Sequence, residues 1–229
     1  MQILLGLGAV IIGYFLGSIP FGLIIVKLKT GKDIRQVESG RTGGTNAVRA
    51  AGLPAGLLTA ILDILKGAAA VWVADALVPQ GHLFHILAPI AAILGHNYSL
   101  FLISRDAEGK PHFHGGAGGA PALGGAMGLW PWMFPIVFGA GALVWFTLGI
   151  ASVTTMTVGL IVTIVFAIRI GLGLQEPIDI WFGIIAELLL LWALRPNIKK
   201  LFAGQERVVK FSLNGWLRAR REAQAESHK

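Results

Sequence analysis

Between Ser39 and Gly52 the sequence reads SGRTGGTNAVRAAG, a glycine-rich polar loop with two arginines. Glycines allow backbone N–H groups to converge on an anion, and arginine offers a planar fork of donors that matches a phosphate. The loop therefore predicts a binding site for a phosphate-sized anion. The alternative is a solvated turn that only joins two helices, because short glycine motifs are weak signals.

A second polar stretch, residues 104–119, reads SRDAEGKPHFHGGAGG. His112 and His114 lie two residues apart, with Asp106 and Glu108 upstream, which raises the alternative of a metal site. The spacing and the lack of a clear third ligand argue against a metal. We favour a glycine-rich entry to a helix, because the amides at a helix N-terminus attract anions.

The third stretch, residues 195–206, reads RPNIKKLFAGQE and follows the last apolar run. It places Arg195, Asn197, Lys199 and Lys200 at one end of that run. The three polar stretches all lie near the ends of expected helices. We expect them to meet on one side of the protein and to form one site.

Composition defines the elements that must position these loops. Apolar residues make up 55% of the chain and charged residues 14%, and the mean hydropathy is +0.70. These values predict an integral membrane protein, because a soluble globule could not cover its surface with the remaining polar residues. Cysteine is absent from the sequence, which excludes disulfides, thiolate nucleophiles and cysteine-ligated metals.

Seven apolar runs approach the roughly 20 residues needed to cross a bilayer, so the predicted fold is all-α with seven transmembrane helices. A count of six stays open, since the fourth run is glycine-rich and a short turn separates it from the fifth. The expected spans are approximately Ile3–Val26, Pro54–Val78, Leu83–Ile103, Gly115–Trp132, Met133–Ile150, Val153–Ile170 and Ile178–Leu194.

Basic residues orient these spans, because cytoplasmic loops retain lysine and arginine. With the N-terminus outside and the C-terminus cytoplasmic, all but two of the 19 basic residues fall inside; Lys66 and Arg169 are the exceptions. The first run is kept as a span, since Lys27 and Lys29 follow it and a signal peptide would carry its charges in front. The pI of about 10.1 then indicates contact with anionic lipid and not with nucleic acid.

Polar side chains inside the spans are costly unless they are paired or line a cavity. Asp63 and Lys66 lie three residues apart on one helix face and can pair, with helix packing as their alternative role. His96 and Glu187 carry the same two alternatives. In the first span Pro20 predicts a kink.

These motifs together resemble the acyl-phosphate:glycerol-3-phosphate acyltransferases of the PlsY type. The resemblance rests on the residue runs GSIPFG (17–22), SGRTGGTNAVRAAG (39–52), DILKG (63–67), Gly95–His96, the glycine stretch 114–124 and NIKKLFAGQE (197–206). It implies a bacterial inner-membrane enzyme with its site facing the cytoplasm and without cofactor or metal. Such enzymes transfer an acyl group from acyl phosphate to the 1-hydroxyl of sn-glycerol 3-phosphate, which yields lysophosphatidic acid and orthophosphate.

The resemblance also implies roles for individual residues. The expected catalytic residues are Ser39, Arg49, Lys66 and His96. The expected substrate- and phosphate-binding residues are Gly40, Gly43, Thr45, Asn46, Gly115, Gly116, Gly118, Asn197 and Lys110. The enzyme-like part spans residues 1–204, and residues 205–229 form a basic cytoplasmic tail. Expected partners are the two substrates and membrane lipids.

The sequence departs from the family pattern at three places. Ala117 replaces the lysine of a GGKG motif, Leu194 replaces the histidine of an RHxxNI motif, and residues are inserted around Arg105–Phe113. An acyltransferase would then use an altered donor, or Lys110 or His114 from this loop would replace the missing lysine. Two alternative functions follow: a non-catalytic relative that binds lipid phosphates, and a carrier of a small phosphorylated solute. A carrier should contain internal repeats, and none is visible.

Overall fold

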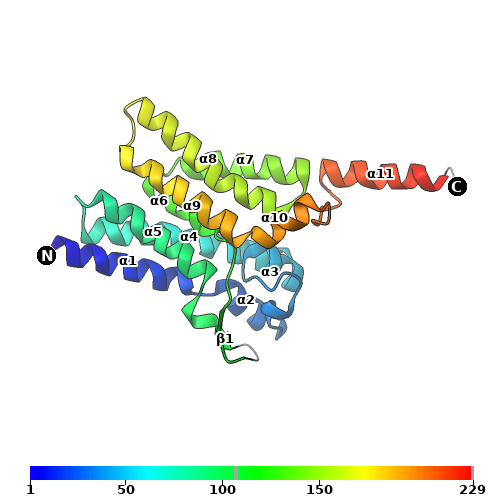
Figure 1. Cartoon of the computed structure of the whole chain (residues 1–229), viewed down its shortest axis with the longest axis horizontal. Helices are drawn as coiled ribbons and strands as arrows, with labels where there is room; N and C mark the ends of the chain where they lie inside the picture. The colour runs from blue at the N-terminus through cyan, green and yellow to red at the C-terminus, as the bar shows by residue number, and fades with distance from the viewer. Residues whose placement is uncertain (106–107, 228–229) are drawn as a thin grey trace.

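The computed structural model describes residues 1–105 and 108–227, which form an elongated bundle of helices with the two termini at opposite ends (Figure 1). The larger helices lie along the long axis. They are α1 (Gln2–Ser18), α2 (Phe21–Thr30), α3 (Gly44–Ala51), α4 (Leu53–Leu77), α5 (His82–Asn97), α6 (Gly119–Leu129), α7 (Met133–Leu148), α8 (Ala151–Gly171), α9 (Ile180–Ala193), α10 (Arg195–Phe202) and α11 (Leu213–Ser227).

The first span is broken in the middle, as Pro20 predicts. Helix α1 ends at Ser18 and α2 begins at Phe21, because proline has no N–H to continue the helical hydrogen bonds. Two side chains from elsewhere satisfy carbonyls at the break. Ser99 Oγ donates to Ser18 O at 2.6 Å, and Lys66 Nζ donates to Ile19 O at 3.0 Å. The break is thus a fixed part of the bundle.

Within the described residues, four segments are long and apolar enough to cross a membrane, and the pair formed by Pro177–Ala193 and Arg195–Phe202, bent by 67°, adds a fifth if it is one span. The fold is therefore that of a helical membrane protein. Not all of the seven expected spans meet this length criterion, because α6 and α7 are shorter than the four long segments. The four long segments are Gln2–Thr30, Leu53–Leu77, His82–Leu102 and Ala151–Gly171.

Helix α6 differs most from its expected span, Gly115–Trp132. It begins at Gly119 and has 11 residues, so it extends about 16 Å, half of a typical hydrocarbon core. Its residues from Pro121 to Ala126 are buried, and its glycines allow close contact with α4. A Cβ on Gly124 would overlap Ile64 O. This short helix lies inside the bundle and not at its lipid-facing surface.

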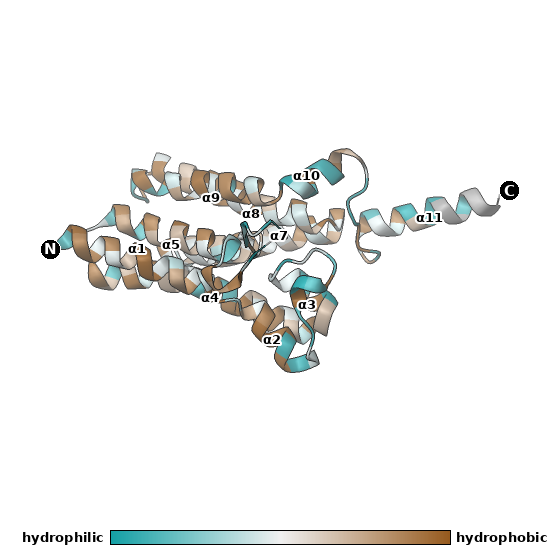
Figure 2. Ribbon diagram, turned by 60° about the horizontal axis from the view of Figure 1, so that its bottom comes forward, coloured by the Kyte–Doolittle hydropathy of each residue, from teal (hydrophilic) through white to brown (hydrophobic). Residues whose placement is uncertain are grey.

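The largest hydrophobic cluster joins α5 and α6 to α7, α8 and α9, with Phe166 and Phe182 fully buried at its centre. Many large apolar side chains on the outer faces of α1, α4 and α8 are exposed, as expected for contact with lipid. Figure 2 shows hydrophilic residues on α3, α10 and α11, at the end of the bundle that leads to the C-terminus. The polar loops therefore lie at one end of the apolar helices.

The insertion carries a small β-hairpin, and the rest of the described chain follows the helical fold expected from the sequence. Strand β1 (Ile103–Arg105) pairs antiparallel with β2 (Pro111–Phe113), and Ser104 lies opposite His112. Short 3-10 turns occupy Ile34–Gln36, Leu100–Leu102 and Pro177–Asp179. The expected tail at 205–229 contains α11, a helix that the sequence analysis did not anticipate.

Candidate active site

A buried polar cluster lies beside the break in the first span. Lys66 Nζ is 2.8 Å from Asp63 Oδ1 and 2.9 Å from His96 Nδ1, and it also donates to Ile19 O. The side chains of Lys66, Asp63 and His96 are each at most 5% exposed. The expected pairing of Asp63 with Lys66 is confirmed. Because the Lys66 ammonium has three partners here, it holds α1, α4 and α5 together.

The first loop is shaped by Asn46. Its Nδ2 donates to Val37 O and Arg41 O at 2.9 Å and to Ile34 O at 3.2 Å. Asn46 therefore fixes the backbone of the loop through its amide nitrogen. The other expected residues of this loop lie around it: Gly40 with φ of +67°, Gly43 as the N-cap of α3, and Ser39, Thr45 and Arg49 with exposed or half-buried side chains.

The second loop packs against both the first loop and α5. Thr42 N donates to Gly115 O at 3.2 Å, and Gly116 N donates to His96 O at 2.9 Å. A Cβ on Gly116 would overlap the His96 imidazole, so only glycine fits this approach. Gly118 adopts φ of +92° and is the N-cap of α6. The expected glycines thus form a tight turn at a helix N-terminus.

Asn97 lies at the same turn and was not among the expected site residues. It is 5% exposed, and neither its Oδ1 nor its Nδ2 has a hydrogen-bond partner among the described residues. A Cβ on Gly118 would lie 2.9 Å from Asn97 Oδ1, which places this amide at the start of α6. An unpaired buried amide is costly and indicates a ligand or water at this point. Its position directly after His96 is the sequence signal that could have identified it.

The third loop meets the first through charged groups. Arg41 Nη2 donates to Ala193 O at 2.7 Å, at the end of α9, and Arg207 pairs with Glu38 at 2.8 Å. Burial lowers the pKa of Arg41, and the charge of Glu206 opposes this shift. These contacts bring the three polar stretches to one end of the bundle.

Asn197 is held by Glu206, a residue that the site prediction left out. Asn197 Nδ2 donates to Glu206 Oε1 at 3.0 Å, and Ser152 Oγ donates to the same oxygen at 2.7 Å. Glu206 therefore orients Asn197 and ties the first turn of α10 to the first turn of α8. The acidic residue stands in the quoted run NIKKLFAGQE, which is the signal that could have identified it.

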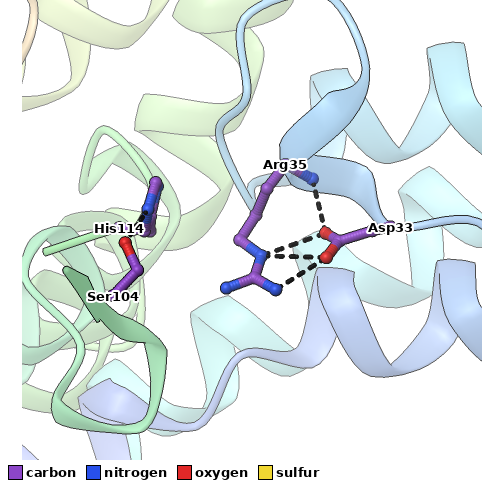
Figure 3. A network of polar contacts seen from close by, with 4 residues as sticks. All are labelled: Asp33, Arg35, Ser104 and His114. Carbon is purple, nitrogen blue, oxygen red and sulfur yellow. Dashed lines mark hydrogen bonds and ion pairs between the residues drawn. The ribbon is translucent and has the colours of Figure 1, made fainter. Parts of the chain in front are cut away.

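Figure 3 shows two polar contacts where the hairpin lies near the 3-10 turn at Ile34–Gln36, which precedes the first loop. Arg35 makes an ion pair with Asp33 at 2.6 Å, which lowers the pKa of Asp33, and Ser104 Oγ lies 2.9 Å from His114 Nε2. Burial lowers the pKa of His114, and the nearby His112 and Arg35 lower it further. The nearby Asp33 opposes this shift. The lowered pKa favours the neutral imidazole at His114, in contrast to the permanent charge of a lysine.

Lys110 and Leu194 do not join the polar contacts described above. Lys110 is exposed and precedes β2, so strand β2 and the segment 114–116 separate it from Ala117. Leu194 is 2% exposed and offers no polar group where the family has histidine. Among the described residues no group of three His, Asp or Glu side chains could hold a metal ion, and Asp106 lies outside the described residues.

The fold and this geometry define a class: a helical membrane protein with arginines, glycine amides and buried polar groups gathered at one end. Comparisons with known proteins then place it more closely. The family model for glycerol-3-phosphate acyltransferase matches residues 7–204. The chain belongs to the glycerol-3-phosphate acyltransferase family.

Relatives with this name cover almost the whole chain. The protein of Anaeromyxobacter sp. (strain Fw109-5) is 35% identical, over 89% of this chain and 96% of its own length. That of Thermosipho melanesiensis is 35% identical, over 87% and 90%. The crystal structure of PlsY (YgiH), an integral membrane glycerol 3-phosphate acyltransferase in its glycerol 3-phosphate form, has a TM-score of 0.76 at 30% identity, over 89% of this chain and 95% of that one.

Proposed function

We propose that this protein transfers an acyl group from acyl phosphate to the 1-hydroxyl of glycerol 3-phosphate and releases lysophosphatidic acid and orthophosphate. Family membership makes the chain a glycerol-3-phosphate acyltransferase, and the names of its relatives favour this enzyme over a carrier or a non-catalytic relative. The observation that carries the proposal is the meeting of the first loop with the glycine turn at the start of α6.

Both substrates carry phosphate groups, and the site offers the matching donors. Arg49 supplies a charged fork, and the loop residues Ser39, Gly40, Gly43 and Thr45 supply hydroxyl and backbone groups. The N-terminus of α6 at Gly118 provides amides and the positive end of a helix dipole. We assign the glycerol 3-phosphate contacts to Asn197 and add Asn97, whose unpaired amide lies at this turn.

The reaction needs no covalent intermediate with the protein and no basic side chain. The 1-hydroxyl oxygen attacks the acyl carbon, the bond from that carbon to the phosphate oxygen breaks, and the leaving phosphate takes the hydroxyl proton. Arginine charge and oriented amides stabilise the oxyanion that forms on the carbonyl. A basic side chain is not required, because phosphate itself accepts the proton.

Lys66 and His96 act as positioning residues in this proposal. Each is buried and hydrogen-bonded within the protein: Lys66 holds the helix break, and the backbone carbonyl of His96 holds the Gly116 amide. Lys66 bonds His96, and His96 bonds Gly116, so the two residues together fix where the glycine turn lies relative to α4 and α5. Their effect on catalysis passes through the position of that turn.

For the orientation, we propose seven membrane segments, with the N-terminus outside and the site facing the cytoplasm of a bacterial inner membrane. In this arrangement α6 is a short segment buried by its neighbours, and α9 continues into α10 through the bend. The basic residues of the three loops support it, since they would all face the cytoplasm.

Complementation tests the function in a cell. A bacterial strain with a conditional defect in its own glycerol-3-phosphate acyltransferase should grow when it expresses this chain. The Arg49→Ala variant, expressed at the same level, should not support growth. Failure of the folded wild-type chain to support growth would favour the non-catalytic relative.

A further inference from the structure

A second polar region lies at the other end of the bundle. The end of α4, the start of α5 and the connection between α8 and α9 surround a hollow of about 480 Å³. The candidate active site is far from it, because His82 and His96 at the two ends of α5 are separated by about 21 Å along the helix. Its polar wall includes Trp72, Asp75, His85, Gln175, Glu176 and Asp179.

Asp179 gives this hollow a buried, incompletely paired carboxylate. Asp179 is 4% exposed and lines the hollow. Oδ2 accepts a hydrogen bond from Gln175 Nε2, whereas Oδ1 has no partner among the described residues. A buried carboxylate oxygen without a donor is costly, so a donor from within the hollow would stabilise it.

Arg169 lies beside the hollow and bonds two of its lining residues, Leu174 and Gln175. Arg169 donates to Gln175 Oε1 at 3.0 Å and to Leu174 O at 2.8 Å, and its guanidinium lies 3.7 Å from the centre of the Trp130 ring. Arg169 therefore orients Gln175 toward Asp179 and does not enter the hollow, whose lining residues do not include it.

The other walls add negative charge and an aromatic surface. Asp75 and Glu176 are exposed and line the hollow, together with His82 and His85. His85 Nε2 lies 2.9 Å from Val78 O and 3.8 Å from Asp75 Oδ1, so Glu176 is the exposed acid without such a neighbour among the described residues. Trp72, half exposed, lines the same space. Carboxylates combined with an indole face are the chemistry that recognises an ammonium group, which has three donors and a compact charge.

We propose that this hollow binds an organic ammonium cation, either the amine of a lipid headgroup or a free polyamine. A metal ion fits less well, because no group of three His, Asp or Glu side chains in the described part of the chain could hold one. Asp179 and Glu176 contact the ammonium group, and Trp72 covers it. The site is independent of acyl transfer and shares no residue with the candidate active site.

Two probes distinguish the sources of the amine. Calorimetric titration with spermidine in detergent, at constant ionic strength, measures the free polyamine. Native mass spectrometry after equilibration with mixed phosphatidylethanolamine and phosphatidylglycerol micelles measures the lipid headgroup. At least one probe should bind the wild-type chain, and Asp179→Asn and Glu176→Gln should each weaken that binding at least tenfold.

The matched control is Glu108→Gln, which removes an exposed acid from the hairpin at the other end of the bundle and should leave binding unchanged. Thermal unfolding of each variant checks that it is folded, and Glu176→Gln changes only an exposed side chain. The proposal is wrong if neither probe binds, if both variants bind as tightly as the control, or if Mg²⁺ alone displaces the amine at lower concentration.

Discussion

Two buried asparagines at the candidate site differ in what their amides do. Asn46 Nδ2 lies within hydrogen-bond distance of the backbone oxygens of Ile34, Val37 and Arg41, although its Oδ1 has no partner among the described residues. In Asn97, neither Oδ1 nor Nδ2 has a partner among those residues. Both residues are at most 5% exposed. The nitrogen of the first amide therefore holds the fold, and we propose that the second amide contacts a substrate.

Substitution by leucine should separate these roles. Asn97→Leu should lower kcat/KM for glycerol 3-phosphate by roughly 10- to 100-fold, which corresponds to one charge-assisted hydrogen bond of about 1.5–3 kcal/mol. Its melting temperature should not fall, because the change removes an unpaired buried amide. Asn46→Leu, the matched control, should lower the melting temperature. Normal kinetics in Asn97→Leu would remove this residue from the site.

At the scale of elements, the glycine turn depends on its close approach to α5. Gly116→Ala should reduce activity strongly, because a Cβ there would overlap the His96 ring. Gly139→Ala in α7 meets no atom within 4 Å and should be neutral or stabilise the helix by about 0.5–1 kcal/mol. Activity assays and thermal unfolding of both variants check this pair. Equal activity in the two variants would show that the turn tolerates displacement.

The hairpin is the element that could supply the missing lysine. If Lys110 contacts the donor phosphate, Lys110→Ala should raise the KM for acyl phosphate about tenfold, equivalent to about 1.4 kcal/mol. Adding Ala117→Lys should partly restore it, since the charge then stands at the start of α6. Donor titrations at saturating glycerol 3-phosphate measure both effects. An unchanged KM in Lys110→Ala would show that the hairpin does not contact the donor.

Several elements could be predicted from the sequence, because a single feature, such as a long apolar run or a proline, determines each of them. Long apolar runs predicted the segments at Gln2–Thr30, Leu53–Leu77, His82–Leu102 and Ala151–Gly171, and Pro20 predicted the break. The start of α6 was wrong by four residues, because hydropathy cannot show that Gly115–Gly118 forms a turn fixed by contacts to His96 and Thr42.

Other features depend on contacts between distant residues. The β-hairpin has only three residues in each strand and no alternating hydrophobic pattern, so period-based reasoning could not detect it. The link from Asn197 to Glu206 spans only nine residues, but its role depends on Ser152 from another helix. The residue types show that Asn197, Glu206 and Ser152 can form hydrogen bonds, but only the fold shows that they are in contact.

At the scale of the whole molecule, the two ends of the bundle differ in the prevailing sign of their charged residues. One end holds the arginine-rich loops, and the other holds the acidic hollow around Asp179. Basic residues orient a membrane protein with the loops inside. A reporter fused after Lys229 should therefore be active in the cytoplasm, and a tag before Met1 should be accessible from outside. Detection of both ends on one side would contradict the seven-segment topology.

The central claim is that the chain uses acyl phosphate and glycerol 3-phosphate despite Ala117 and Leu194. The most direct measurement is turnover by the purified protein in detergent, with palmitoyl phosphate or palmitoyl-CoA as the donor and product analysis by mass spectrometry. We predict one orthophosphate released for each 1-acyl lysophosphatidic acid formed, and no turnover with palmitoyl-CoA. Turnover with palmitoyl-CoA alone, or none with either donor in the folded protein, would contradict the account.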